Sequence, residues 1–193
     1  MRIVAGAHRG RALAAPVGDA VRPTADRVRE ALFSMLQSGR YGGDRVRAAR
    51  VLDACAGSGA LGLEALSRGA DHCTFLDNAG PAIAAIHANV AALGVGNRAQ
   101  VLRADVTRPP GAPAGCDLIF LDPPYRDGLV PAALAALAAA GWCAPGALVA
   151  VEHDARTPVA APEGFVEAIS RTYGRTCVTL LVWQAPSGPG FRV

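Results

Sequence analysis

Lysine is absent from this chain of 193 residues, and all nineteen basic residues are arginine. Arginine suits phosphate, but an alanine- and arginine-rich genome explains the missing lysine more simply. The distribution of charge is more informative than the residue type. Residues 1–50 hold ten arginines against four acidic residues, a formal charge of +6, whereas the remaining residues carry −3. A polyanionic partner would therefore meet the N-terminal quarter first.

Long apolar runs are absent as well. No stretch approaches the ~20 consecutive apolar residues that a membrane-spanning helix needs. The first residues, Met1-Arg2-Ile3-Val4-Ala5-Gly6, contain no apolar core of the kind that a signal peptide has. We therefore expect no association with a membrane.

Disulfide and metal-binding patterns are also missing. The five cysteines are odd in number, lack C-x-x-C spacing and mostly lie in apolar runs, where a thiol behaves as a small hydrophobic group. We expect reduced thiols and a cytoplasmic protein. The four histidines show no ligand spacing, so no metal site is predicted.

A single domain accounts for residues 1–193, because 51% of the residues are apolar and can bury a core in a monomer. We divide it into an N-terminal extension, residues 1–45, and a core, residues 46–193. In the core, short apolar runs alternate with helical stretches. The candidate strands are 50–54, 72–77, 99–103, 117–122, 147–152, 165–172 and 176–183, and the candidate helices are 60–68, 80–93 and 129–140. This order predicts an α/β, Rossmann-like fold with a doubly wound, mostly parallel sheet of seven strands that ends in an antiparallel hairpin.

The N-terminal extension carries two weaker structural signals. Residues 2–14 alternate loosely between glycines, which predicts a short β-hairpin. From Thr24, a helix cap precedes apolar residues at i, i+3 and i+4 spacing. The opposite face of this predicted helix would present Arg27 and Arg29 to solvent or to a ligand.

A glycine-rich loop follows the first predicted strand. Its three glycines satisfy the G-x-G-x-x-G pattern, in which the backbone approaches a ligand closely and a helix then begins. A tight turn between a strand and a helix would explain the same pattern without any ligand. The residues predicted to bind a cofactor here are Asp53, Ala56, Gly57, Ser58 and Gly59.

Acidic residues stand at the ends of three successive predicted strands, where a doubly wound sheet binds its ligand. Asp77, with Asn78 beside it, is placed to bind both ribose hydroxyls of an adenosine, and Asp105, with Val106, to reach the adenine amino group. Either aspartate alone could be a solvated strand end or a helix cap. Asp53 would repel a pyrophosphate but suits a cationic sulfonium, which favours S-adenosylmethionine over NAD.

The segment Asp122-Pro123-Pro124-Tyr125 follows an apolar strand and is the most specific motif in the sequence. The lone pair of an exocyclic amine on a base is delocalised into the ring, so a catalyst needs two fixed acceptors to turn it toward a methyl group. Asp122 offers one acceptor and the carbonyl of Pro123 the other, because successive prolines restrict the backbone. Tyr125 offers a ring for the extruded base. The motif predicts transfer of a methyl group to a base amine.

These motifs resemble the RsmD family of bacterial ribosomal RNA methyltransferases. The matching segments are 1–6 with Arg9-Gly10, 22–33, 56–62, 64–70 and 122–125. The resemblance implies a class I methyltransferase that uses S-adenosylmethionine and methylates N2 of one guanine in 16S rRNA within small ribosomal subunits. It also implies roles for Asp77 at the ribose, Asp105 at the adenine and Asp122 at the target amine.

The basic extension has no obvious role within such a core and is therefore a candidate for docking RNA through Arg9, Arg11, Arg22 and Arg27. Other functions remain open at this point. An adenine-N6 DNA methyltransferase or a protein-glutamine methyltransferase would use the same loop. From other classes, an NAD-dependent dehydrogenase or a non-catalytic RNA-binding module would fit the fold alone.

Overall fold

The computed structural model describes residues 1–16, 23–123 and 128–185. Its seven strands form one sheet in the order β3-β2-β1-β4-β5-β7-β6, as predicted. Their bounds are β1 Arg50–Ala54, β2 His72–Asp77, β3 Ala99–Arg103, β4 Cys116–Leu121, β5 Cys143–Asp154, β6 Phe165–Tyr173 and β7 Thr176–Trp183. β1 to β5 pair in parallel, and β7 pairs antiparallel with both β5 and β6.

The prediction was wrong at the start of β5, which begins at Cys143 rather than at residue 147. Pro145 and Gly146 suggest a turn, and Gly146 does adopt a left-handed φ of 74°. The pairing of β4 with β5 nevertheless continues across an irregularity to Cys116 and Cys143. A bulge therefore accommodates residues that usually end a strand.

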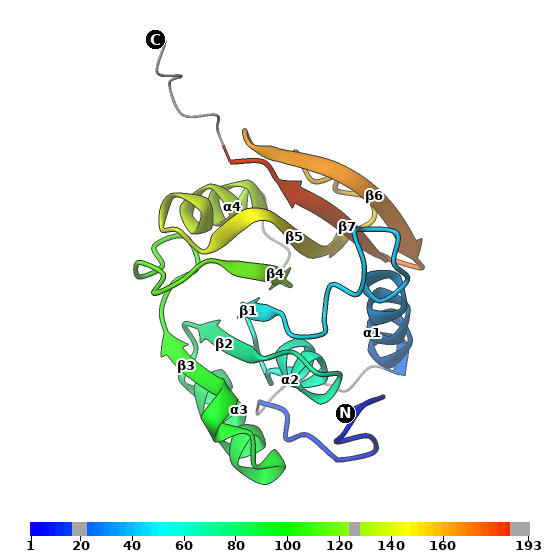
Figure 1. Ribbon diagram of the computed structural model, residues 1–193, viewed down its shortest axis with the longest axis vertical. Helices are drawn as coiled ribbons and strands as arrows, with labels where there is room; N and C mark the ends of the chain where they lie inside the picture. Colours follow the sequence, from blue (N-terminus) through cyan, green and yellow to red (C-terminus); the bar gives the residue numbers. More distant parts are fainter. Residues whose placement is uncertain (17–22, 124–127, 186–193) are drawn as a thin grey trace.

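Within the described residues, four α-helices cover the two faces of the sheet (Figure 1). They are α1 Pro23–Leu36, α2 Ala60–Ser67, α3 Gly80–Leu93 and α4 Leu129–Ala139, and a short 3-10 helix, Gly96–Arg98, precedes β3. One core packs α1, α2 and α3 against the sheet and contains Phe33 and Phe120, whose ring centroids lie 5.5 Å apart. The second core packs α4 against the opposite face around Trp142. No helix within the described ranges combines the length and apolar character that crossing a bilayer requires.

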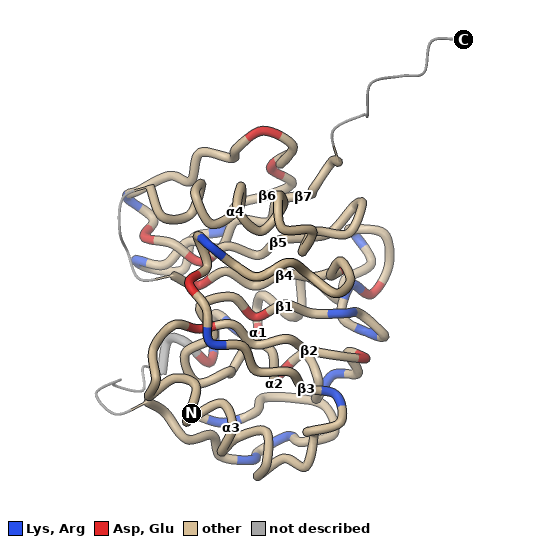
Figure 2. Tube along the Cα trace, turned by 90° about the vertical axis from the view of Figure 1, so that its left-hand side faces the viewer, with Lys and Arg blue, Asp and Glu red and all other residues tan. Residues whose placement is uncertain are grey.

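The strand order reverses between β1 and β4, because β2 continues the sheet on one side of β1 and β4 on the other. Ligands of doubly wound sheets bind at the carboxyl ends of the strands beside such a reversal. Figure 2 shows several acidic positions gathered along one edge of the sheet beside β1, β4 and β5. The topology therefore directs the search for a site to the ends of β1, β2 and β4.

The predicted N-terminal hairpin is present, with an antiparallel bridge between Arg2 and Ala12. Backbone hydrogen bonds join its two arms, from the N–H of Ile3 to the carbonyl oxygen of Arg11 and from the N–H of Leu13 to that of Met1, and the segment also bonds to α2. The backbone N–H groups of Val4 and Ala5 donate to the two carboxylate oxygens of Glu64, at 2.8 and 3.0 Å. The backbone N–H of Ala7 donates to the carbonyl oxygen of Ser67, and further bonds join residues 5 and 8 to its hydroxyl.

Arg29 corrects a second prediction, because its side chain is only 5% exposed. Its Nη2 donates to the carbonyl oxygen of Arg2 at 2.7 Å and to the carboxylate of Asp26 at 2.9 Å. Its Nε lies 3.7 Å from the fully buried carboxylate of Glu64, which also accepts a hydrogen bond of 2.8 Å from Arg68 Nε. We call Glu64, Arg29 and Arg68 the Glu64 cluster. Arg27 is exposed, as predicted.

Candidate functional site

The thiol of Cys55 marks the point where the predicted carboxylates converge. Burial, and then the negative charges of Asp77, Asp122, Asp53 and Asp105, together raise its pKa to about 12. These aspartates come from β1, from the end of β2 and from the segments after β3 and β4. Four acidic groups that are far apart in the sequence therefore surround one small region at the carboxyl edge of the sheet.

The glycine-rich loop departs from ordinary backbone geometry where the cofactor was predicted to bind. Cys55, Gly57 and Gly59 have left-handed φ values of 61°, 55° and 78°. A Cβ placed on Gly57 would meet open space, whereas one on Gly62 would overlap the ring of Phe75 and the sulfur of Cys73. Gly62 thus allows α2 to pack closely on β2, and Gly57 leaves its backbone accessible to a ligand.

Asp77 joins this loop to the next helix. One carboxylate oxygen accepts a hydrogen bond of 2.9 Å from the N–H of Gly57, and the other accepts one of 2.9 Å from the N–H of Ala79. The side chain is half-buried, and its neighbour Asn78 is exposed. Asp77 therefore stands between the glycine-rich loop and α3, within reach of whatever binds to the loop.

Asp105 lies after β3 in a turn that it stabilises itself. The N–H and the hydroxyl of Thr107 both donate to one of its carboxylate oxygens, at 2.8 and 2.7 Å. These bonds lower the pKa of Asp105, and Arg108 lowers it a little more. Val106 is buried and fixes the turn against the α4-side core. The carboxylate of Asp105 is thus held ionised at the edge of the site.

Asp53 is buried beneath the glycine-rich loop and does not face solvent, where a cation would bind directly. Its side chain is 2% exposed, and its Oδ2 accepts a hydrogen bond of 2.8 Å from the N–H of Gly62 in the first turn of α2. Its pKa is raised to about 7, because burial and the charge of Asp77 raise it more than the hydrogen bond from Gly62 lowers it. Asp53 therefore fixes the shape of the loop and acts on a bound cation only through the electric field.

The raised pKa of Asp53 predicts a pH dependence of stability. The carboxyl ionises near 3.8 in the unfolded chain and only at about 7 in the native protein, so the native state binds more protons between these values. We expect the free energy of unfolding of the ligand-free protein to fall as the pH rises from about 4 to about 7. Asp53→Asn, which keeps an acceptor for Gly62, should remove this contribution, and urea unfolding of both proteins at pH 5 and pH 8 would measure it. An equal pH dependence in the two proteins would contradict the prediction.

Asn89, which the sequence did not single out, connects the glycine-rich loop to the N-terminal extension. Its side-chain amide donates to the carbonyl oxygens of Ser58 and Ala14, both at 2.9 Å, and accepts a bond of 2.8 Å from the N–H of Ala14. Asn89 is 2% exposed and Ser58 7%. A polar residue on the apolar face of α3 was the available signal. Ala56 is half-buried beside them.

Asp122 follows directly after β4, and its side chain is exposed. The surrounding protein still desolvates the carboxylate and raises its pKa, and the charges of Glu152 and Asp53 raise it further. Pro123 is buried behind it. Pro124 and Tyr125, the other two residues of the predicted catalytic loop, lie outside the described residues, as does Arg22. Glu152, near the carboxyl end of β5, is a neighbour of Asp122.

Two of the arginines predicted to dock RNA belong to the N-terminal segment, and one of the four histidines lies near the end of β5. Arg9 and Arg11 are exposed, and Arg11 Nη2 donates to the carbonyl oxygen of Ala92 at 3.3 Å. His153 is buried and shares a hydrogen bond of 2.9 Å with the hydroxyl of Thr179. Among the described residues, no group of three or more potential ligands is arranged to hold a metal ion.

Comparisons with known proteins agree with this architecture. A family model described as conserved hypothetical protein 95 matches residues 1–182. Ribosomal RNA small subunit methyltransferase D of Haemophilus influenzae is 34% identical over 178 residues, which are 90% of this chain and 89% of that protein. The protein of the same name from Escherichia coli strain K12 is 39% identical over 157 residues, 80% of this chain and 75% of its own length. The chain belongs to the RsmD family of methyltransferases.

Solved structures confirm the fold of this RsmD-family chain. YhhF from Escherichia coli superposes with a TM-score of 0.81 at 33% identity, over 96% of this chain and 98% of its own. The Thermus thermophilus 16S rRNA N2 G1207 methyltransferase RsmC, in complex with AdoMet and guanosine, gives a TM-score of 0.63 at 22% identity, over 87% of this chain and 44% of its own. The latter likeness shows the class I methyltransferase fold alone.

Proposed function

We propose that this RsmD-family protein transfers a methyl group from S-adenosylmethionine to the exocyclic N2 amine of one guanine in 16S rRNA, within the small ribosomal subunit. The observation that carries the proposal is the convergence of Asp122 with three further aspartates at the carboxyl edge of the sheet. The names of the curated relatives, which are ribosomal RNA small subunit methyltransferases, support the substrate. The protein would act as a monomer in the cytoplasm.

The residues at the sheet edge fit the proposed cofactor. The backbone at Gly57 is open to a ligand, Asp77 would bind the ribose hydroxyls, and Asp105 would bind the adenine amine. The surrounding negative charge suits a cation and disfavours the pyrophosphate of NAD. When bound, S-adenosylmethionine supplies an electrophilic methyl group on a positively charged sulfur.

Asp122 and Pro123 would hold the target amine. The carboxylate accepts a hydrogen bond from the NH2 group and the Pro123 carbonyl accepts a second, which turns the nitrogen lone pair toward the methyl group. The proline that follows restricts the backbone of Pro123, and Tyr125 would stack on the base. The raised pKa of Asp122 makes its carboxylate a suitable acceptor for the proton that the methylated amine releases. Alignment would supply most of the rate enhancement.

Methyl transfer measured on several acceptors in parallel tests the proposal. The acceptors are unmethylated small ribosomal subunits, naked 16S rRNA, duplex DNA and protein, each with labelled S-adenosylmethionine. Label in guanine of the rRNA is the expected result. Label confined to adenine of DNA or to glutamine of protein would agree with the proposed role of the catalytic loop but would contradict the proposed substrate. No transfer to any acceptor, together with binding of NAD or of RNA alone, would overturn the activity.

The N-terminal extension would dock the RNA through Arg9, Arg11, Arg22 and Arg27. We expect Arg9→Glu combined with Arg11→Glu to weaken RNA binding at least about tenfold, because two cations near the phosphates become anions. The affinity for S-adenosylmethionine should stay unchanged. Fluorescence anisotropy with an rRNA fragment and calorimetry with the cofactor measure the two affinities. Unchanged RNA affinity at moderate salt would show that the N-terminal extension does not contribute to RNA binding.

A further inference from the structure

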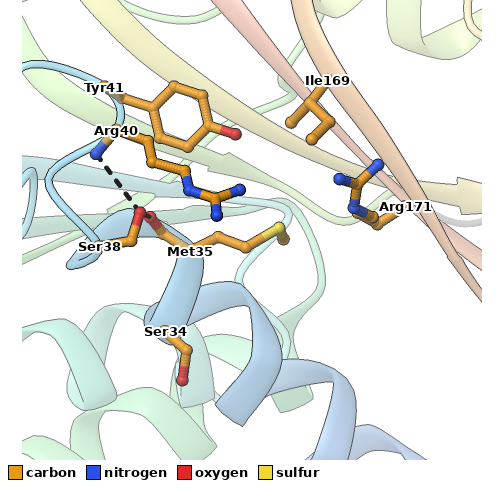
Figure 3. A pocket seen from close by; sticks show the side chains of 7 residues that line it. All are labelled: Ser34, Met35, Ser38, Arg40, Tyr41, Ile169 and Arg171. Atoms are coloured by element: carbon orange, nitrogen blue, oxygen red, sulfur yellow. Dashed lines mark hydrogen bonds between the residues drawn. The ribbon is translucent and has the colours of Figure 1, made fainter.

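A hollow of about 220 Å³ lies between the end of α1 and the face of β6, away from the aspartates described above. Figure 3 shows Arg40 and Arg171 projecting toward it from opposite sides, one from the loop after α1 and the other from β6. Met35, Tyr41 and Ile169 supply an apolar floor that packs against the α1-side core. Sites for whole small molecules usually measure about 300–1,000 Å³, so this hollow fits part of a polymer better than a free metabolite.

The two arginines keep their charge available. Both side chains are exposed, and none of the ion pairs among the described residues involves Arg40 or Arg171. Arg171 Nη1 makes a long bond of 3.3 Å to the carbonyl oxygen of Ser170. The turn that carries Arg40 is shaped by the hydroxyl of Ser38, which donates to the carbonyl oxygen of Met35 at 2.7 Å. Two guanidinium groups around one space offer the charge and the hydrogen-bond donors that suit an anion.

The register of the sheet relates this hollow to the catalytic loop. Arg171 of β6 pairs with Val178 of β7, and Val178 in turn pairs with Glu152 of β5. Asp122 follows β4, which pairs in parallel with β5 and places Asp122 level with Glu152. Neighbouring strands are about 4.8 Å apart, so the backbone at Arg171 lies about 14 Å from that at Asp122.

The hollow and Asp122 also share one face of the sheet. Ile169 packs into the α1-side core, and Arg171, two residues further along β6, points to the same side. In β5, Ala150 belongs to that core, and Glu152, two residues further, again points to the same side. A strand of RNA that reaches Asp122 at the carboxyl edge of the sheet can therefore continue along that edge to the hollow without crossing to the other face.

We propose that this hollow binds a backbone phosphate of the RNA between Arg40 and Arg171, near the nucleotide whose base enters the active site. The sugar or base attached to that phosphate would rest on Met35 and Tyr41. Contacts to nucleotides that flank an extruded base contribute to the choice of target. The inference rests on the proposed function, and it assigns an RNA contact to the C-terminal hairpin, which the sequence did not implicate.

The salt dependence of RNA binding tests this inference. Each contact between a cation and a phosphate of single-stranded RNA contributes about 0.7 to the slope of log affinity against log salt. Arg40→Gln and Arg171→Gln should each lower the magnitude of the slope by about 0.7, and the double variant by about 1.4. Arg47→Gln is the matched control, because Arg47 is also exposed but lies near Gly69, outside the hollow.

Two further measurements separate the possible outcomes. The double Arg→Lys variant should keep the wild-type slope, and all variants should bind S-adenosylmethionine as the wild type does. If the wild type methylates rRNA and the double Gln variant keeps its slope, the hollow is not an RNA site and the proposed function stands. A loss of slope in Arg47→Gln equal to that of the double variant would also overturn the inference. If the wild type neither methylates nor binds rRNA, both proposals fail.

Discussion

Replacing Asp122 by Asn is expected to slow methyl transfer to rRNA by about 10²–10⁴-fold, the usual contribution of a positioned acid or base. The amide can still accept one hydrogen bond from the target amine, but it can neither carry the negative charge nor take up the released proton. Affinity for S-adenosylmethionine should change only a few-fold, because Asp53, Asp77 and Asp105 remain. Single-turnover transfer with saturating cofactor measures the chemical step directly.

Asp71→Asn is the matched control for this variant. Asp71 is exposed and precedes β2, at the opposite edge of the sheet from the acidic cluster. The Asp71→Asn variant loses the same charge as Asp122→Asn and should transfer the methyl group at the wild-type rate. Transfer by Asp122→Asn within tenfold of the wild type would exclude Asp122 from the chemistry.

The pH profile of the wild type should carry the signature of the same carboxylate. Because desolvation and then the charges of Glu152 and Asp53 raise the pKa of Asp122, kcat/KM should rise with pH over a range above that of an ordinary carboxyl. Removing the charge of Glu152 by Glu152→Gln should shift this rise to lower pH. A profile identical to that of the wild type would show that Glu152 does not influence Asp122.

Replacing Glu64 by Ala should destabilise the protein by about 3–5 kcal/mol, since it removes the buried anion that Arg29 and Arg68 share and leaves Arg29 with Asp26 alone. The carboxylate of Glu64 is fully buried and meets Arg29, Arg68 and the backbone N–H groups of Val4 and Ala5. Its loss also frees the N-terminal extension from α2. Urea unfolding measures the stability, and limited proteolysis within residues 2–14 measures the release of the extension.

An ion pair with an exposed cation is the control for the Glu64 cluster, and its carboxylate, that of Asp154, keeps a second partner in Arg156. Arg175 is 82% exposed and lies 3.7 Å from the carboxylate of Asp154, and surface pairs of this kind contribute about 0–1 kcal/mol. Arg175→Ala should therefore leave the unfolding midpoint almost unchanged. A similar loss of stability in Glu64→Ala and Arg175→Ala would show that burial does not make the ion pairs of Glu64 more important for stability than an exposed pair.

The sequence predicted the sheet well because each strand is a short apolar run between clear breaks. The positions of Asp77, Asp105 and Asp122 followed from the same pattern, since residues after parallel strands share one edge of the sheet. Charge burial was harder to predict. Arg29 was expected on a solvent-facing side because its partner Glu64 lies 35 positions away, and only the fold brings them together.

Glu64 itself gave a signal that could have been used. It is the single charged residue within the otherwise apolar helix Ala60–Ser67, and a charge in such a setting requires a partner. The structural role of Asp53 was not foreseen for a related reason. Its bond to Gly62 spans only nine positions, but it forms because the chain turns back through left-handed residues at Cys55 and Gly57. Spacing along the sequence does not reveal that reversal.

The three hydrogen bonds of Asn89 have a thermodynamic consequence. One side chain orders Ser58 in the glycine-rich loop and Ala14 in the N-terminal extension. Whatever immobilises one of these segments therefore lowers the entropy that the other must lose on binding its own ligand. The two ligands should bind with positive cooperativity, and by linkage the increase in affinity is the same whichever binds first. A bound cofactor would thus raise the affinity of the protein for RNA. Dissociation of the demethylated cofactor would lower that affinity again and favour release of the methylated product.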